Sequence, residues 1–159
     1  MVGEESEKES DQMIIQEIPY ESALFEATRK LRDEVLRRPI GLTLSAADIE
    51  GENHQIHIAA IDDSGDVRGT VILKPLSESL VKLRQMSVSP ACQGQGCGKQ
   101  LVRFAERVAL ERGYKLIELA ARISALGFYE KLGYRTEGEK FTEVTLPTIK
   151  MVKALDTTG

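Results

Sequence analysis

A glycine-rich segment between a predicted strand and a predicted helix constrains the fold of this chain most strongly. The strand ends at Val88, three glycines follow at alternate positions (Gly94, Gly96 and Gly98), and the helix begins near the last of them. A helix N-terminus carries unpaired N–H groups and the positive end of the helix dipole, so it attracts anions. Glycine leaves no side chain over the backbone and allows positive φ angles that point successive N–H groups inward. The segment is therefore predicted to bind a diphosphate.

Two common phosphate-binding motifs do not fit this segment. A P-loop needs a glycine five positions before its Gly-Lys pair, but Gln93 stands there, and Gln100 rather than serine or threonine follows Lys99. A dinucleotide fingerprint needs Gly-x-Gly-x-x-Gly, and Lys99 replaces its third glycine after Gly94 and Gly96. Neither motif accounts for the glycine spacing.

The pattern Gln/Arg-x-x-Gly-x-Gly/Ala does match, over residues 93–98. This hexapeptide resembles the coenzyme A pyrophosphate loop of the GNAT N-acetyltransferase superfamily. A second segment, Ala125-x-x-Phe128-Tyr129-Glu130-Lys131-Leu132-Gly133-Tyr134, resembles another signature of that superfamily and follows the first after one predicted helix and one predicted strand. The resemblance covers Val81 to Tyr134 and, more weakly, the final strand pair.

The resemblance implies an α/β fold: a mixed, mostly antiparallel central sheet of about seven strands with a splayed parallel pair, flanked by about four helices. Hydrophobic patterning predicts strands over residues 14–18, 56–61, 67–73, 80–88 and 115–121. Amphipathic helices are expected around Leu24–Val35 and Leu101–Val108, with Arg32 among the charged residues that lie mostly away from the apolar side of the first helix. A capping box at Ser45–Asp48 predicts a short helix ended by Gly51.

The strand that precedes the glycine loop carries an irregularity. Its apolar residues stand at odd positions up to Leu83 and at even positions from Met86, which predicts a β-bulge near Arg84 or Gln85. A bulge can leave backbone groups unpaired for a ligand. The resemblance implies that the parallel strands splay here to admit the pantetheine arm, and that backbone N–H groups near Met86 to Val88 hold the thioester and its oxyanion.

The resemblance also assigns residues to acetyl-CoA as co-substrate. Tyr129 stands where the superfamily often has the tyrosine that protonates the departing sulfur, and a phenol with a pKa of ~10 is protonated at pH 7. The competing interpretation of Tyr129 is a buried tyrosine whose hydroxyl only satisfies a core partner. Phe128 and Leu132 are expected to form the core face of the same short helix. No metal is expected. The expected coenzyme A contacts are Met86, Ser87, Val88, Gln93, Gly94, Gln95, Gly96, Cys97, Gly98, Lys99, Arg122, Ala125 and Tyr129.

The general base is not assigned by the sequence. Gln85 lies near where many superfamily members carry a glutamate, and an amide cannot accept the proton of an amine. The base could be Glu118, Glu143 or a water chain. His54 and His57 are further candidates, although both are expected to face solvent around the second strand.

Two other positions depart from the superfamily pattern. Arg122 stands where many members have an asparagine, and it could replace the contact of that amide to the pantetheine arm or contact a phosphate. Thr148 stands where one branch of the superfamily usually has a histidine. This difference puts the activity or the specificity in question.

Charge and composition limit the possible partners and the location. The net charge of −4 arises in residues 1–12, which hold five acidic and one basic side chain, so 20 acidic and 20 basic side chains remain elsewhere. Residues 1–12 are predicted to be a disordered acidic tail, and residues 13–156 a single domain. Overall charge indicates no nucleic-acid partner. No apolar run approaches the ~18 residues of a membrane span, and no signal peptide is evident. Cys92 and Cys97 are expected to be free thiols in the cytoplasm.

We therefore expect an N-acetyltransferase that moves an acetyl group from acetyl-CoA to the primary amine of a small molecule or peptide by direct attack. The alternative is a non-catalytic acyl-CoA-binding regulatory or interaction module, and a generic α/β scaffold comes third. The acceptor stays open among polyamines, amino acids, antibiotics, amino sugars and peptide lysines, and a homodimer stays open as well.

Overall fold

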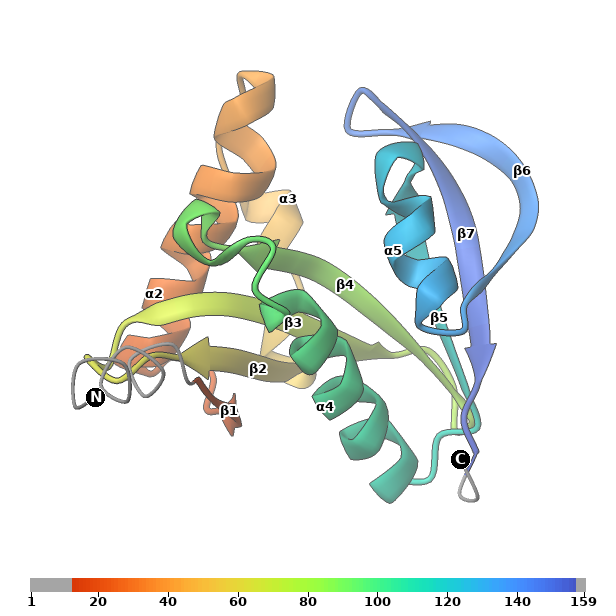
Figure 1. Ribbon diagram of the computed structural model, residues 1–159, viewed down its shortest axis with the longest axis horizontal. Coiled ribbons are helices and arrows are strands. Elements are labelled where there is room, and N and C mark those ends of the chain that lie inside the picture. The colour runs from red at the N-terminus through yellow and green to blue at the C-terminus, as the bar shows by residue number, and fades with distance from the viewer. Residues whose placement is uncertain (1–12, 157–159) are drawn as a thin grey trace, which may run out of the picture. The chain divides into compact units, whose positions relative to one another are not determined.

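The computed structural model describes residues 13–156, whose strands form one seven-stranded sheet (Figure 1). β4 and β5 run parallel, whereas the pairs β1–β2, β5–β7 and β6–β7 are antiparallel. The predicted mixed sheet with a parallel pair is thus confirmed. In hydrogen-bonding order the strands are β1 (Ile14–Ile18), β2 (Ile56–Ile61), β3 (Val67–Pro75), β4 (Leu80–Val88), β5 (Leu116–Arg122), β7 (Leu146–Ala154) and β6 (Arg135–Glu143).

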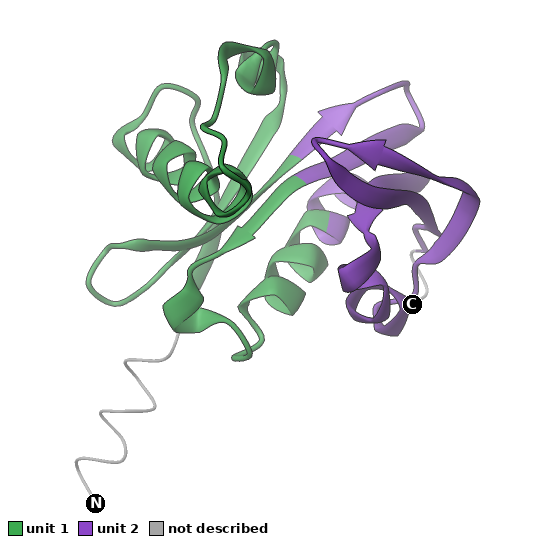
Figure 2. Cartoon of the chain, turned by 90° about the horizontal axis from the view of Figure 1, so that it is seen from above, with its two compact units in different colours: residues 1–72, 85–105 green, residues 73–84, 106–159 purple. Residues whose placement is uncertain are grey.

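Four α-helices accompany the sheet within residues 13–156: α2 (Ala23–Arg32), α3 (Ala46–Ile49), α4 (Cys97–Glu111) and α5 (Leu126–Lys131). The chain divides into two compact units (Figure 2). The first holds the described residues up to 72 together with residues 85–105, and the second holds residues 73–84 and those from 106 onward. The predicted acidic tail, residues 1–12, lies outside the described residues, and the assignment of residues 13–156 to a single domain stays a prediction. None of the helices in the described part of the chain is long and apolar enough to be a membrane span.

In the first unit, α2 packs one face against the sheet. Ser22 caps the helix through its side chain, which accepts a hydrogen bond from the N–H of Phe25 at 3.1 Å. Phe25 forms a core cluster with Ile18 of β1 and Ala59 of β2. The helix continues through a π-helical turn and a 3₁₀ turn and ends at Gly41, whose φ of 77° only glycine adopts without strain. The amphipathic helix predicted here is confirmed.

The connection from α2 to β2 is held by ion pairs and a cap. Ser45 and Asp48 form the predicted capping box at the start of α3. Asp48 also accepts two hydrogen bonds from Arg37, at 3.1 Å to Nε and 2.9 Å to Nη2. This bidentate pair fastens α3 to the π-helical turn at Asp33–Arg37.

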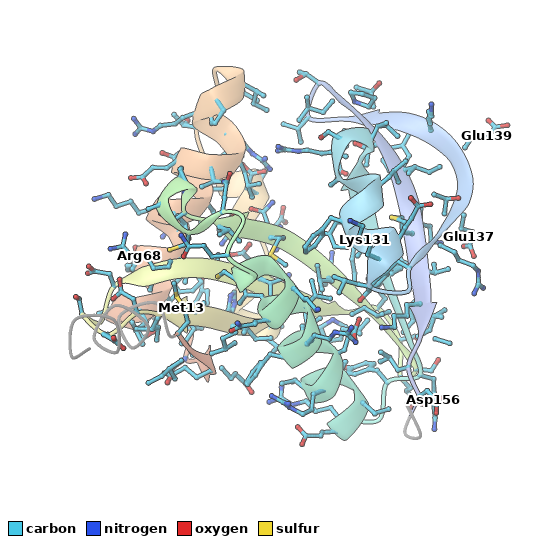
Figure 3. The ribbon with its side chains drawn as sticks, viewed as in Figure 1. Met13, Arg68, Lys131, Glu137, Glu139 and Asp156 are labelled. Carbon is cyan, nitrogen blue, oxygen red and sulfur yellow. The ribbon has the colours of Figure 1, made fainter. Side chains whose placement is uncertain are left out.

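In the second unit, one network joins α4, the end of α5 and β7. Glu106 accepts a hydrogen bond from the Tyr134 hydroxyl at 2.9 Å and from Lys153 Nζ at 3.1 Å. Lys153 also donates to the Leu132 carbonyl at 2.7 Å. β6 is exposed along its whole length, and Glu139 points outward from it (Figure 3).

Three predictions of burial are wrong, each for a tertiary reason. His57 is buried rather than facing solvent, because its ring packs edge-on against Phe25 and its Nε2 lies 2.8 Å from the Glu52 carbonyl. Arg32 was expected away from the apolar side of α2, but it is fully buried against Glu52. Phe128 was expected in the core, yet it is 38% exposed, because α5 turns Tyr129 inward instead.

Candidate active site

The predicted diphosphate-binding loop is an open turn that leads into α4. A 3₁₀ turn at Pro90–Cys92 follows β4, and Gly94 and Gly96 then take left-handed φ angles of 80° and 84°. A Cβ atom on either glycine would meet no atom within 4 Å, so backbone conformation rather than crowding favours glycine here. α4 begins at Cys97, one residue before the predicted start.

Several backbone N–H groups at the start of α4 donate to no acceptor within residues 13–156. The first hydrogen bond of the helix runs from the Gln100 N–H to the Gly96 carbonyl at 3.0 Å. Unpaired N–H groups at the positive end of a 15-residue helix favour an anion. The loop therefore fits a diphosphate. The N–H groups without an acceptor are those of Gly94, Gly96, Cys97, Gly98 and Lys99.

Two glutamine side chains hold the loop in shape. Gln93 Nε2 donates to the Val88 carbonyl at 3.0 Å, and Gln95 Nε2 donates to the Ala91 carbonyl at 3.2 Å. Both side chains are exposed but bonded to the loop itself. Their contacts with coenzyme A stay predictions, and the role that the structure gives them is to fix the loop backbone.

Side chains of α4 pack closely against the backbone of β3 at Gly69. A Cβ atom at this position would lie 2.8 Å from Leu101 Cδ1 and 2.9 Å from Cys97 Sγ. Cys92 and Cys97 are both free and buried, as the free-thiol prediction required. Burial, with a smaller effect from Cys92, raises the pKa of the Cys97 thiol to about 11. The side chain of Cys97 therefore packs the helix, and only its backbone N–H points to a ligand role.

The predicted bulge in β4 is confirmed at Gln85, which has a left-handed φ of 57° inside the strand. The buried Ser87 donates from Oγ to the Gln85 carbonyl at 3.2 Å. The Gln85 side chain accepts a hydrogen bond from Arg32 Nε at 3.0 Å, and Arg32 forms a bidentate pair with Glu52. β4 pairs with β5 before this point, from Leu80 to Lys82. The predicted thioester contacts, Met86 to Val88, follow the bulge directly.

Sequence reasoning missed Arg32 and Glu52. Charged side chains are rarely fully buried unless they are paired, and nothing local pairs residues that are 20 positions apart. The available signal was weak: Arg32 follows the core residue Leu31, at the margin of the apolar stripe of α2.

In the second unit, Tyr129 is buried on α5, with its ring edge-on to Phe128 and to Tyr134. Burial raises the pKa of its phenol to about 12, and the nearby Arg122 guanidinium opposes this rise. Its hydroxyl forms no hydrogen bond with any other residue in the 13–156 range. The competing interpretation of Tyr129 requires a core partner for the hydroxyl, and no described residue is that partner.

The other predicted contacts in the second unit lie at the end of β5. Arg122 is the last residue of that strand, opposite Thr148 of β7, and Ala125 precedes α5. Thr148 is buried, and its hydroxyl donates to the Leu146 carbonyl at 3.0 Å. Thr148 thus stands at the last residue pair of the β5–β7 ladder, with its side chain buried. The roles of Arg122 and Ala125 toward coenzyme A stay predictions.

The candidate bases differ in their surroundings. Glu118 is half-buried, and Lys150 Nζ lies 3.5 Å from its carboxylate and 3.1 Å from that of Glu137. Glu143 and His54 are exposed, whereas His57 is enclosed. Glu118 is thus the half-buried carboxylate among these candidates, and it lies on β5, the strand that ends at Arg122.

Each unit holds features that the sequence associates with acyl transfer. The first unit holds a glycine loop with unpaired N–H groups and a bulged strand. The second unit holds a protonated, buried phenol. Donors aimed at developing negative charge and a proton source are the usual means of stabilising this reaction.

Comparisons with known proteins point to one family. A family model described as an acetyltransferase (GNAT) domain matches residues 52–136, more than half of the chain. The matched region begins just before β2 and ends in β6, so it contains both the glycine loop and Tyr129.

Individual relatives agree with this match. A Bacillus subtilis protein whose name proposes acetyltransferase activity is 37% identical over 75 residues, covering 47% of this chain and 51% of that protein. The chain spans about half the length of the curated relatives it matches, or less.

Solved structures share the fold along nearly the whole chain. The crystal structure of a Lactobacillus plantarum protein, proposed to be an N-acetyltransferase, is similar with a TM-score of 0.82 and 25% identity, covering 90% of this chain and 98% of the other. A GNAT family acetyltransferase from Elizabethkingia anophelis, solved with acetyl-CoA bound, has a TM-score of 0.71 and 18% identity, covering 91% and 99%.

Proposed function

The chain belongs to the GNAT acetyltransferase family, and from that premise we propose that it moves an acetyl group from acetyl-CoA to a primary amine. The observation that carries the proposal is a run of backbone N–H groups, broken only at Gln95, that donate to no acceptor among the described residues: those of Gly94, Gly96, Cys97, Gly98 and Lys99. Such a run suits the linked phosphates of coenzyme A, because each N–H can donate to a phosphate oxygen without a side chain in between.

The chemistry of direct acetyl transfer defines what the protein must supply. Attack of an amine nitrogen on the thioester carbonyl forms a C–N bond and breaks the C–S bond. Negative charge develops on the carbonyl oxygen and then on sulfur, and the amine loses a proton. The site therefore needs oriented donors, a proton for the sulfur and an acceptor for the amine proton.

Each of these needs has a candidate in the chain. The backbone from Met86 to Val88, after the β4 bulge, would orient the thioester carbonyl. Tyr129, with its pKa raised to about 12, is protonated at neutral pH and would donate to the sulfur. Of the candidate carboxylates Glu118 is half-buried and Glu143 is exposed, which supports Glu118 as the group that would take the amine proton, directly or through water.

Binding and turnover experiments test the proposal in two stages. Calorimetric titration with acetyl-CoA should show saturable binding, and no binding would reject acetyl transfer. Thiol release should then be measured with a panel of primary amines: a polyamine, an amino acid, an aminoglycoside, an amino sugar and a lysine peptide. Binding without thiol release above the rate of hydrolysis, for every amine, would favour an acyl-CoA-binding module over an enzyme.

A further inference from the structure

A fully buried arginine contacts the bulge of β4 from a distant part of the sequence. Arg32, at the end of α2, donates a hydrogen bond from each of its three guanidinium nitrogens. Nε donates to Gln85 Oε1 at 3.0 Å, Nη1 donates to Glu52 Oε1 at 2.9 Å and Nη2 donates to Glu52 Oε2 at 2.5 Å. All three residues belong to the first unit. Arg32 therefore connects α2, the turn before β2 and β4.

The residue that Arg32 contacts has the unusual backbone conformation. Gln85 has a φ of 57° in the middle of β4, a left-handed conformation that residues other than glycine seldom adopt because it is strained. The Gln85 carbonyl accepts a hydrogen bond from the Ser87 hydroxyl, and the Gln85 side chain accepts a hydrogen bond from Arg32 Nε. Hydrogen bonds therefore hold Gln85 on both its main chain and its side chain, and the conformation is constrained from two directions.

Stability alone does not explain a charge pair at this depth. Both side chains are fully buried, and a buried ion pair is often no more stabilising than apolar side chains of the same volume. What the pair provides is geometry, because the planar guanidinium has its two terminal nitrogens fixed by Glu52 and its Nε directed at Gln85. Lysine could satisfy the charge of Glu52 but could not hold both partners.

We propose that Arg32, oriented by Glu52, is a positioning residue for the acetyl thioester: by holding the Gln85 bulge it sets the direction of the backbone from Met86 to Val88. This inference rests on the proposed function, since it assigns the thioester carbonyl to that backbone. Arg32 acts only through Gln85. The glycine loop binds the diphosphate independently of the Arg32–Gln85 contact.

Three variants test this role. Arg32→Lys keeps the positive charge beside Glu52 but cannot also reach Gln85. Gln85→Met keeps the Arg32–Glu52 pair and removes only the acceptor, so it is decisive if Arg32→Lys fails to fold. Arg37→Lys is the matched control, because Arg37 forms a similar bidentate pair with Asp48 and makes no hydrogen bond or ion pair with β4 in the described chain.

Two readouts separate positioning from a general loss of structure. The first is the ratio of the Kd for acetyl-CoA to the Kd for CoA, which isolates the acetyl group. The second is the ¹³C shift of bound [1-¹³C]acetyl-CoA, because hydrogen bonds to the carbonyl oxygen move that signal downfield. In Arg32→Lys and Gln85→Met we expect the ratio to rise about three- to tenfold, the loss of one hydrogen bond. The ¹³C signal should move toward that of free acetyl-CoA, and Arg37→Lys should match the wild type in both.

The outcomes distinguish this inference from the proposed function. If both test variants keep the wild-type Kd ratio and ¹³C shift, the positioning role of Arg32 is overturned. If the wild type binds neither acetyl-CoA nor CoA, the proposed function fails, and amide hydrogen exchange at Met86 to Val88 then decides on the Arg32 contact. Faster exchange there in both test variants, but not in Arg37→Lys, supports the contact, and unchanged exchange refutes it.

Discussion

The Tyr134 hydroxyl donates a 2.9 Å hydrogen bond to Glu106 Oε2, which links the chain just after α5 to α4. The same carboxylate accepts a hydrogen bond from Lys153 Nζ of β7. The Lys153 ammonium lies 5.6 Å from the centre of the Tyr134 ring. Tyr134 in turn packs edge-on against Tyr129, with ring centres 5.8 Å apart. Glu106 thus stabilises the surroundings of the predicted acid without touching it.

Replacing Glu106 should therefore destabilise the fold. Glu106→Ala removes the carboxylate that accepts hydrogen bonds from the half-buried Lys153 ammonium and from the Tyr134 hydroxyl, and we expect the free energy of unfolding to fall by about 1–2 kcal/mol. Urea denaturation measures this difference. Glu111→Ala, on the exposed end of the same helix, is the control and should change the free energy of unfolding little. Equal effects of the two substitutions would contradict this role of Glu106.

The glycine loop should be sensitive to any side chain at Gly96. Gly96→Ala meets no steric obstacle, but it must adopt a φ of 84°, so we expect the loop to shift and the Kd for CoA to rise about tenfold or more as charge-assisted N–H contacts are lost. Gly65→Ala is the matched control, since Gly65 has a φ of 86° and equally open surroundings in the β2–β3 turn. Calorimetry should show weaker CoA binding only in Gly96→Ala, and equal CoA affinities for the two variants would refute the loop assignment.

Tyr129→Phe should lower turnover while it leaves CoA binding nearly unchanged. Loss of a general acid reduces kcat by about 10²-fold, because the departing sulfur then takes its proton from water. Steady-state thiol release with the best amine of the panel measures this, and Tyr114→Phe serves as the control. A wild-type kcat in Tyr129→Phe would remove Tyr129 from the acid role.

Tyr129 should lose its proton at a higher pH than an ordinary tyrosine. Burial raises its pKa from 10 to about 12, so the neutral phenol is favoured in the folded state. The stability that this contributes is complete below pH 10 and is lost as the pH rises through 12. Absorbance of tyrosinate near 295 nm should therefore show one late-titrating group in the wild type that is missing from Tyr129→Phe. If the group missing from the titration of Tyr129→Phe, compared with the wild type, has a pKa near 10, the burial of this phenol is contradicted.

Asp48 should make stability depend on acid pH. Its hydrogen bonds with Arg37, the largest cause, and with Ser45 lower the pKa of its carboxyl from 3.8 to about 2. This stabilisation is therefore present above pH 4 and is lost as the pH falls through 2. We expect Asp48→Asn to cost about 1–2 kcal/mol at pH 7, allowing for solvent screening, and almost nothing near pH 2. Denaturation at both pH values tests this, with the exposed Asp63→Asn as the control. A cost that does not change with pH would show that the ion pair is not its source.

Local chemistry was the part of this molecule that could be predicted from the sequence. The positive φ angles of Gly94 and Gly96, the capping box at Ser45 and the bulge at Gln85 all follow from residue type or from the spacing of neighbours. Each depends on interactions within a few residues. The corresponding predictions are confirmed because nothing distant had to be known.

Burial could not be predicted in the same way. Phe128 and Tyr129 are adjacent on a helix of six residues, where periodicity is too short to say which ring faces inward. The structure exposes Phe128 and buries Tyr129, and that choice raises the pKa of the predicted acid.

The amino-acid sequence by itself determined the order of strands and helices, the glycine loop before α4 and the family, because these depend on local spacing and on motifs a few residues long. Only the tertiary structure brought Arg32 within hydrogen-bonding distance of both Gln85 and Glu52, and Glu106 within hydrogen-bonding distance of Tyr134. A buried charge is stable only beside its partner, and the partner is chosen by the packing of elements that are far apart along the chain.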